Sequence, residues 1–147
     1  MNPFRYYLRV RYVECDAQRV VFNSRYSEYV DVGVNEFLRA SGVLDRFTAG
    51  HLDFQLVKQT IEWKRPARYD QVLELTFETL GLGTTSFTIG ARIRVAGEEP
   101  VLASIDTVYV LMDGPTLTKR PLPADIRAAL EHGAPGKTTD HAAYART

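Results

Sequence analysis

Residues 24–41 read SRYSEYVDVGVNEFLRAS, and the apolar side chains in this stretch recur at steps of three and four residues. The recurring positions are Tyr26, Tyr29, Val30, Val34, Phe37 and Leu38. Because such steps place side chains on one side of a helix, the spacing predicts an amphipathic helix over about residues 24–41. Asn23 or Ser24 stands where an N-cap is expected, and Gly42 stands where a C-terminal cap is expected. A helix of this kind needs an apolar surface to cover its stripe.

The segments around this helix supply that surface, because they alternate between apolar and polar residues as half-buried β-strands do. We expect strands at residues 5–13, 54–65, 72–80, 85–95 and 101–112. Pro66 ends the second strand, and Leu80–Gly83 and Ala96–Pro100 join the last three strands as hairpins. The sequence therefore predicts an α+β domain in which one antiparallel sheet of five strands packs on one long helix.

The chain has 147 residues, about the length of one domain. A short helix that starts after Pro121 or Pro123 and runs to about His132 should close it. We therefore place the domain at residues 1–132. Residues 133–147 are rich in Gly, Ala and Thr and show no apolar period, so we expect them to form a loose tail.

Composition and charge narrow the classes of protein to consider. With 45% apolar and 24% charged residues, the chain is typical of globular proteins. Lys and Arg number 18, as do Asp and Glu, so the positive surface typical of nucleic-acid binders is not expected. Cys15 is the only cysteine, which excludes an internal disulfide and a zinc-type cysteine cluster. No apolar run is long enough for a signal peptide or a membrane span, so we expect a cytoplasmic protein without a membrane or nucleic-acid partner.

The loop from Glu14 to Asn23, ECDAQRVVFN, carries the most chemical information. Asp16 stands shortly before the predicted helix, whose first backbone N–H groups lack partners and carry the positive end of the helix dipole. Such N–H groups can stabilise an oxyanion, while a carboxylate acts as a general base on water or attacks a carbonyl directly. A loop aspartate is more often a turn or cap residue, so this pattern alone leaves both roles open.

Four segments resemble one known family: Arg9–Asp16 (RVRYVECD), Val20–Tyr26 (VVFNSRY), Glu36–Gly42 (EFLRASG) and Arg65–Ala67. Together with the strands after them they are similar to the 4-hydroxybenzoyl-CoA thioesterase family of the hotdog fold, over nearly all of residues 4–112. The resemblance implies a curved antiparallel sheet wrapped around one long helix. It also implies an acyl-CoA thioesterase, which hydrolyses a CoA thioester to free CoA and a carboxylic acid without a metal or redox cofactor.

The resemblance also implies roles for single residues. Asp16 would be the general base or nucleophile, and the backbone N–H of Asn23, at the start of the helix, would lie in the oxyanion hole. Tyr26 would shape the acyl pocket or belong only to the core, since it lies on the apolar stripe. The family usually has glycine two or three residues after the aspartate, where this chain has Gln18 and Arg19. If the backbone there needs a positive φ, we expect the loop to follow another path, because other residues rarely adopt that conformation.

Basic residues are the candidate contacts for CoA phosphates. Arg19 would face the acyl group or the phosphates, or else remain a solvated loop residue. Lys64 and Arg65, with Lys58 and Arg68, would bind phosphates or protect a sheet edge from aggregation. His51 and Asp53 have no further ligand cluster near them, so we expect no metal site.

The open sheet edge predicts at least a homodimer, and the family resemblance extends this to a homotetramer. Gln18 and Arg19 motivate an alternative, a non-catalytic hotdog module that binds acyl-CoA or acyl-carrier protein. A hotdog hydratase ranks last, because no histidine suits the Asp/His pair that it would use. A carboxylate pair or metal site formed by Glu14 and Asp16, and a nucleophilic Cys15, are less favoured than their structural roles.

Overall fold

The computed structural model describes residues 2–144. Its strands are β1 (Phe4–Arg9), β2 (Leu52–Trp63), β3 (Val72–Leu82), β4 (Ser86–Val95), β5 (Val101–Asp113) and β6 (Thr138–Asp140). Its helices are the one-turn η1 (Tyr12–Glu14), the long α1 (Arg25–Ala40), the short α2 (Leu44–Thr48) and α3 (Ala124–His132). The expected long helix, the three hairpin-linked strands and the C-terminal helix are confirmed within a few residues, whereas α2 was not expected.

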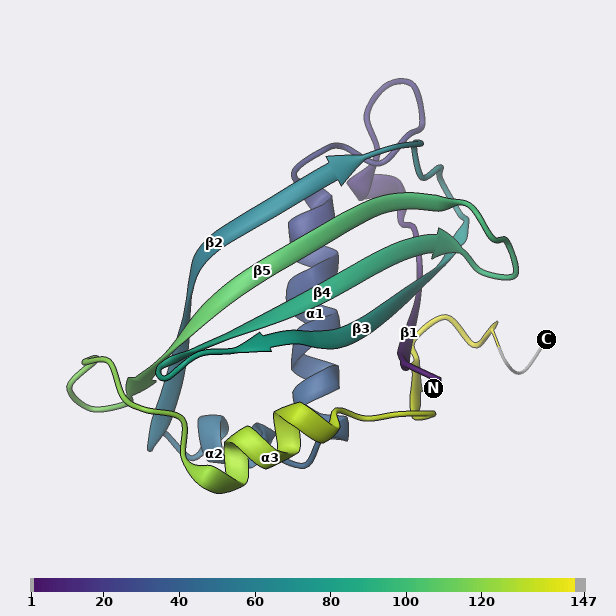
Figure 1. Cartoon of the computed structure of the whole chain (residues 1–147). Helices are drawn as coiled ribbons and strands as arrows, with labels where there is room; N and C mark the ends of the chain where they lie inside the picture. Colours follow the sequence, from purple (N-terminus) through teal and green to yellow (C-terminus); the bar gives the residue numbers. More distant parts are fainter. Residues whose placement is uncertain (1, 145–147) are drawn as a thin grey trace.

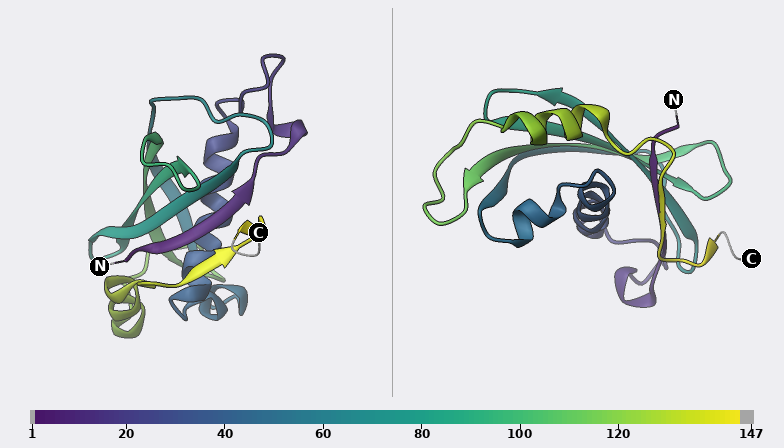
Figure 2. Two further views of the ribbon diagram at one scale, coloured as in Figure 1. Left: turned by 90° about the vertical axis from the view of Figure 1, so that its right-hand side faces the viewer. Right: turned by 90° about the horizontal axis from the view of Figure 1, so that it is seen from below.

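The six strands form one sheet in the order β2-β5-β4-β3-β1-β6. Neighbouring strands from β2 to β1 are antiparallel, and β6 is parallel to β1. The sheet curves around α1, which is clearest where Figure 2 looks along the helix (Figures 1 and 2). This arrangement confirms the hotdog fold that the resemblance implies.

The core lies between the concave face of the sheet and α1. Alternate residues of β3 and β4 are fully buried there, as their period-two pattern predicts. They pack with the apolar stripe of α1 in one cluster that includes Leu73, Leu75, Phe77, Ile89, Ile93, Val34, Phe37 and Leu38. Gly33 allows the closest approach, because a Cβ at this position would lie 2.2 Å from Cζ of Phe77. Gly42 ends α1 with a φ of +83°, as expected of a C-terminal cap.

The first strand is shorter than predicted. β1 ends at Arg9, and the chain turns through η1 before reaching the loop that contains Asp16. The side chain of Glu14 causes this turn, since its Oε1 accepts the backbone N–H of Arg11 at 2.7 Å. Alternating side chains up to residue 13 mimic a strand, but a carboxylate that binds the backbone three residues earlier favours a helical turn.

The structure corrects the expectation of a loose tail for residues 133–144. The N–H of Arg5 donates to the carbonyl of Lys137 at 3.1 Å, and the N–H of His141 donates to the carbonyl of Tyr7 at 2.9 Å. These bonds pair β6 with β1 and make six strands where five were expected. The free edge of β1 offers unpaired backbone groups, which a segment without any apolar period can satisfy. Residues 145–147 lie outside the described part of the chain.

Candidate active site

A cavity of about 400 Å³ lies where three segments meet: the loop after η1, the start of α1 and the segment that follows β2. It is lined by Asp16, Val20, Val21, Asn23, Tyr26, Trp63, Lys64, Arg65 and Pro66. Five of the six residues that the sequence nominated as site residues are therefore brought together. The exception is Arg19, which is exposed and does not line the cavity.

Asp16 closes a tight turn with its own side chain and backbone. The N–H of Gln18 donates to its Oδ1 at 2.8 Å, and the N–H of Arg19 donates to its carbonyl at 3.0 Å. The N–H of Asp16 in turn donates to the carbonyl of Val20 at 3.0 Å. Asp16 is thus a turn residue, but only one carboxylate oxygen is used. Within residues 2–144, Oδ2 takes no hydrogen bond, so it is available to a molecule in the cavity.

The turn contains a residue with left-handed backbone at the place where the resembled family usually has glycine. Arg19 has a φ of +62°. A residue other than glycine therefore adopts the positive φ here, so the absence of glycine does not by itself prevent this backbone conformation. The carbonyl of Arg19 accepts the N–H of Tyr69 at 3.0 Å, which helps to hold this conformation.

Tyr26 fastens α1 to the segment that follows β2. Its hydroxyl oxygen accepts the buried N–H of Ala67 at 3.1 Å, and the carbonyl of Ala67 accepts the N–H of Val21 at 2.8 Å. Burial raises the pKa of Tyr26, so the phenol is neutral at physiological pH. The ring still lines the cavity, so both roles weighed for Tyr26 coexist: it is a core residue and a wall of the site.

The first turn of α1 faces the same cavity. The helix begins at Arg25, and Ser24 at the N-cap makes no side-chain capping bond. Within the described residues, no hydrogen bond uses the backbone N–H of Asn23. An unpaired N–H at the positive end of a helix is a suitable donor to a developing negative charge. Asn23, whose N–H is unpaired, and Asp16, whose Oδ2 is unbonded, thus line the same cavity.

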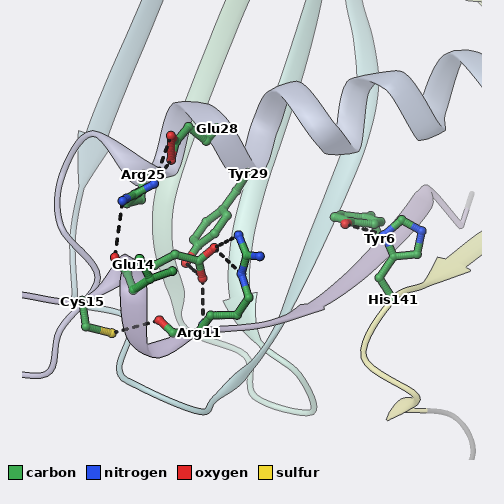
Figure 3. Close-up of polar contacts among 9 residues, drawn as sticks. Tyr6, Arg11, Glu14, Cys15, Arg25, Glu28, Tyr29 and His141 are labelled. Carbon is green, nitrogen blue, oxygen red and sulfur yellow. Dashed lines mark hydrogen bonds and ion pairs between the residues drawn. The ribbon is translucent and has the colours of Figure 1, made fainter.

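Sequence reasoning missed the structural role of Glu14, which holds this loop from behind (Figure 3). Only 6% of Glu14 is exposed. Its carboxylate accepts the backbone N–H of Arg11, two guanidinium N–H groups of Arg11 at 3.0 and 2.8 Å, and the hydroxyl of Tyr29 at 2.9 Å. Burial alone would raise the pKa of Glu14, but these hydrogen bonds outweigh it and lower the pKa. The spacing in sequence carried no signal for this network, because Tyr29 lies on another element.

The network excludes the paired role considered for Glu14 and Asp16. Glu14 lines a different cavity from Asp16, and its carboxylate is occupied by Arg11 and Tyr29. Residues 15–23 are called the Asp16 loop below. The carbonyl of Glu14 accepts the N–H of Phe22 at 2.9 Å, which ties the two ends of this loop together. Glu14 is thus a support for this loop.

Cys15 and the remaining candidates have structural roles or none. The thiol of Cys15 contacts the carbonyl of Arg11 at 3.7 Å, and burial raises its pKa, which disfavours the nucleophilic thiolate. Among residues 2–144, no three His, Cys, Asp or Glu side chains are grouped so that they could hold a metal ion. No helix in this part of the chain is long and apolar enough to cross a membrane.

Comparisons with known proteins agree with this fold. The model of the thioesterase-like superfamily matches residues 10–130. An acyl-CoA thioester hydrolase of Escherichia coli, YbgC, is 31% identical over 126 residues, which are 85% of this chain and 93% of that protein.

Among solved structures, a hypothetical protein from Aquifex aeolicus has a TM-score of 0.78 at 27% identity, with 87% of this chain and 99% of the other covered. The probable thioesterase YbaW from Escherichia coli has a TM-score of 0.77 at 26% identity, with 86% and 96% covered. The fold, the cavity beside α1 and the match over residues 10–130 together show that this chain belongs to the thioesterase-like superfamily.

Proposed function

We propose that this protein is a cytoplasmic acyl-CoA thioesterase that uses Asp16 as its catalytic carboxylate. Membership of the thioesterase-like superfamily makes it a thioester hydrolase. The observation that carries the assignment to Asp16 is that its unbonded Oδ2 and the unpaired N–H of Asn23 belong to one cavity. A carbonyl carbon placed between them would be open to attack on one side and polarised on the other.

In the general-base form of the reaction, Asp16 takes a proton from water, and the resulting hydroxide adds to the thioester carbonyl carbon. The N–H of Asn23, together with the dipole of α1, stabilises the oxyanion of the tetrahedral intermediate. The intermediate then collapses, the C–S bond breaks, and the CoA sulfur takes up the proton that Asp16 received. In the nucleophilic form, Asp16 adds directly to the carbonyl carbon, the C–S bond breaks, and the CoA thiolate leaves and takes a proton from solvent. Water then hydrolyses the resulting mixed anhydride to the carboxylic acid and restores the carboxylate of Asp16.

Lys64 and Arg65 are the proposed contacts for CoA phosphates. Both are exposed at the rim of the cavity, directly after β2. Their position lets the long CoA moiety remain in solvent while the thioester enters beside Asp16. The narrower relationship to 4-hydroxybenzoyl-CoA thioesterases is a further proposal. It rests on the RVRYVECD and VVFNSRY segments, and an aromatic acyl-CoA therefore belongs in the substrate panel.

We also propose a homodimer that joins the outer edges of two β2 strands, with a tetramer as a further possibility in this family. No described strand pairs with the outer edge of β2. This strand exposes apolar side chains, with Val57 55% and Trp63 53% exposed. Because Trp63 also lines the cavity, a partner on this edge would complete the wall of the site.

A second candidate function is binding of acyl-CoA or acyl-carrier protein without turnover. The observation that favours it is Arg19, whose left-handed backbone replaces the usual glycine directly beside Asp16. If the strained loop held Asp16 away from the thioester, the protein would bind the thioester without hydrolysing it.

The deciding experiment measures the release of CoA thiol from short, long and aromatic acyl-CoA thioesters by the wild type and by Asp16→Asn. We expect turnover of at least one substrate, and a loss of about a hundredfold or more in Asp16→Asn, the scale of a lost general base. Asp53→Asn is the matched control, because Oδ1 of Asp53 also accepts a neighbouring backbone N–H at 2.8 Å but lies outside the cavity. Binding of CoA ligands without turnover by any of the proteins would favour the second candidate.

A further inference from the structure

A second cavity, of about 390 Å³, lies behind the Asp16 loop and shares no residue with the cavity of Asp16. β1, η1, α1 and the segment after β6 enclose it, and they contribute Tyr6, Arg11, Tyr29 and His141 among others. The volume lies in the range of small-molecule sites. His141 follows the matched residues 10–130, so one wall belongs to a part of the chain that the family model does not include.

The apolar walls of this cavity come from the rings of Tyr6 and Tyr29 and from the side chains of Leu8 and Val32. Tyr6 and Tyr29 are buried, whereas Val32 on α1 is 48% exposed and stands at the opening. An occupant would thus meet apolar side chains on α1 and on β1. This surface suits an aromatic ring or a short alkyl chain.

The polar side of the cavity carries hydrogen-bond donors, and each of its two arginines is paired with a carboxylate. Glu14 is the one carboxylate in the wall, and its oxygens accept the hydrogen bonds of Arg11 and Tyr29 described above. Within the described residues, Nη1 of Arg11 has no hydrogen bond, and Figure 3 shows this nitrogen on the side of the guanidinium that faces Tyr6 and His141. Arg9 adds a second positive charge at the rim, where it pairs with Asp70.

His141 is fixed in position across the cavity from Arg11. Its Nδ1 lies 2.7 Å from the hydroxyl of Tyr6, and its Nε2 lies 3.9 Å from Oε1 of Glu36 on α1. Burial, assisted by Glu36, raises the pKa of Tyr6 to about 12, so the phenol remains protonated and can donate to Nδ1. Arg11 and His141 thus provide polar groups at two sides of a space whose wall also contains Glu14 and Arg9.

We propose that this cavity is a second binding site, for a small organic carboxylate with an aromatic or short aliphatic body. The free N–H groups of Arg11 would bind the carboxylate, and the body would lie between Tyr6, Tyr29 and Val32. A cation would not suit the site, because the carboxylate of Glu14 is already occupied. The proposal does not depend on activity at Asp16, since the two cavities have separate walls.

The test is a titration of the full-length protein with benzoate, with neutral benzamide of the same shape as the matched ligand control. In an NMR experiment, the imidazole proton signals of the three histidines show where benzoate binds. We expect benzoate to shift the signals of His141 in a saturable way and to leave those of His51 unchanged. Benzamide should bind at least about tenfold more weakly, because it lacks the charge that Arg11 binds.

Two substitutions on α1 test the location independently of ligand charge. Val32→Trp should fill the opening and weaken benzoate binding by about tenfold or more. Asn35→Trp, at another exposed position on the same helix that does not line this cavity, should leave binding unchanged. The proposal is overturned by the absence of saturable shifts, by equal affinity for benzamide, or by equal effects of the two substitutions. Loss of binding in Asp16→Asn would assign the ligand to the other cavity and would also refute it.

Discussion

At the scale of single residues, the Asp16 loop is held by side chains that do not touch the proposed substrate. Glu14 binds the loop to η1 and α1, and Tyr26 binds the start of α1 to the segment after β2. Arg19 adopts a backbone conformation that costs a residue with a Cβ about 1–2 kcal/mol. The position of Asp16 is therefore set by neighbours on both sides, one of which is strained.

The strain at Arg19 predicts that Arg19→Gly is more stable than Arg19→Ala by about 1 kcal/mol. Both variants lose the same exposed side chain, so the difference isolates the left-handed backbone. Chemical denaturation of the two variants measures it. If Arg19→Ala proves equally stable, the loop does not require a positive φ at this position.

From the lowered pKa of Glu14 we predict that the protein loses part of its free energy of unfolding in acid. Its pKa is lower in the folded protein than in the unfolded chain, so its ionised form stabilises the fold above the unfolded pKa of about 4.3. This contribution is lost as the pH falls through the folded pKa. We expect Glu14→Gln to lower the free energy of unfolding at pH 7 by about 1–3 kcal/mol and to flatten its dependence on pH below about 4.5.

Unfolding curves from pH 7 to pH 3 test this expectation, with Glu28→Gln as a control on an exposed glutamate that pairs with Arg25. A pH dependence that is unchanged in Glu14→Gln would show that other carboxylates cause the acid transition.

At the scale of elements, the contact between α1 and β3 fixes how closely the helix lies on the sheet. Gly33 faces the ring of Phe77, which is 1% exposed and packs against the rings of Phe4 and Phe37. With other rings against it, Phe77 has little space to move away. The approach of α1 to β3 therefore depends on the absence of a side chain at position 33.

Gly33→Ala should consequently destabilise the protein by about 1–3 kcal/mol, although alanine is the better helix former. The added Cβ would lie 2.2 Å from Cζ of Phe77. Gly81→Ala is the matched control in β3, because no heavy atom lies within 4 Å of a Cβ at that position. Urea unfolding of both variants provides the comparison, and similar midpoints would contradict this account of the packing.

At the scale of the whole molecule, the two edges of the sheet differ. The C-terminal segment covers the edge of β1 with β6, whereas β2 ends the sheet on the other side with twelve residues and exposed apolar side chains. An edge of this length and character favours pairing with another chain. The covered edge leaves β2 as the surface for the proposed dimer.

We expect Val57→Lys to shift the protein from dimer towards monomer in sedimentation experiments and to reduce thioester turnover in parallel. A positive charge on each β2 would place like charges at the paired edges. Val13→Lys, at an exposed apolar position in η1, is the control and should leave the sedimenting species a dimer. A wild type that sediments as a monomer while turning over substrate would refute the proposed dimer.

The local patterns of the sequence determined the class of the fold and most of its elements, but not α2, β6 or the end of β1. The three- and four-residue steps of α1 and the alternation in β3 and β4 report which face of each element is buried. The position of Asp16 before a helix start suggested a carboxylate near helix N–H groups, but the nomination of Asp16 and Asn23 as site residues came from the family resemblance. Lys64 and Arg65 were nominated from the resemblance and from their charge. The periodicity of β2 gives no information on which other segments lie beside these two residues.

Contacts between distant segments emerged only in the folded chain. Tyr6 and His141 are 135 positions apart, and Tyr26 and Ala67 are 41 positions apart. The pairing of β6 with β1, the burial of Glu14 against Tyr29 and the meeting of Asp16 with Arg65 depend on how far the sheet curves around α1. Local patterns contain no information on that curvature, because it results from the packing of all strands on the helix at once.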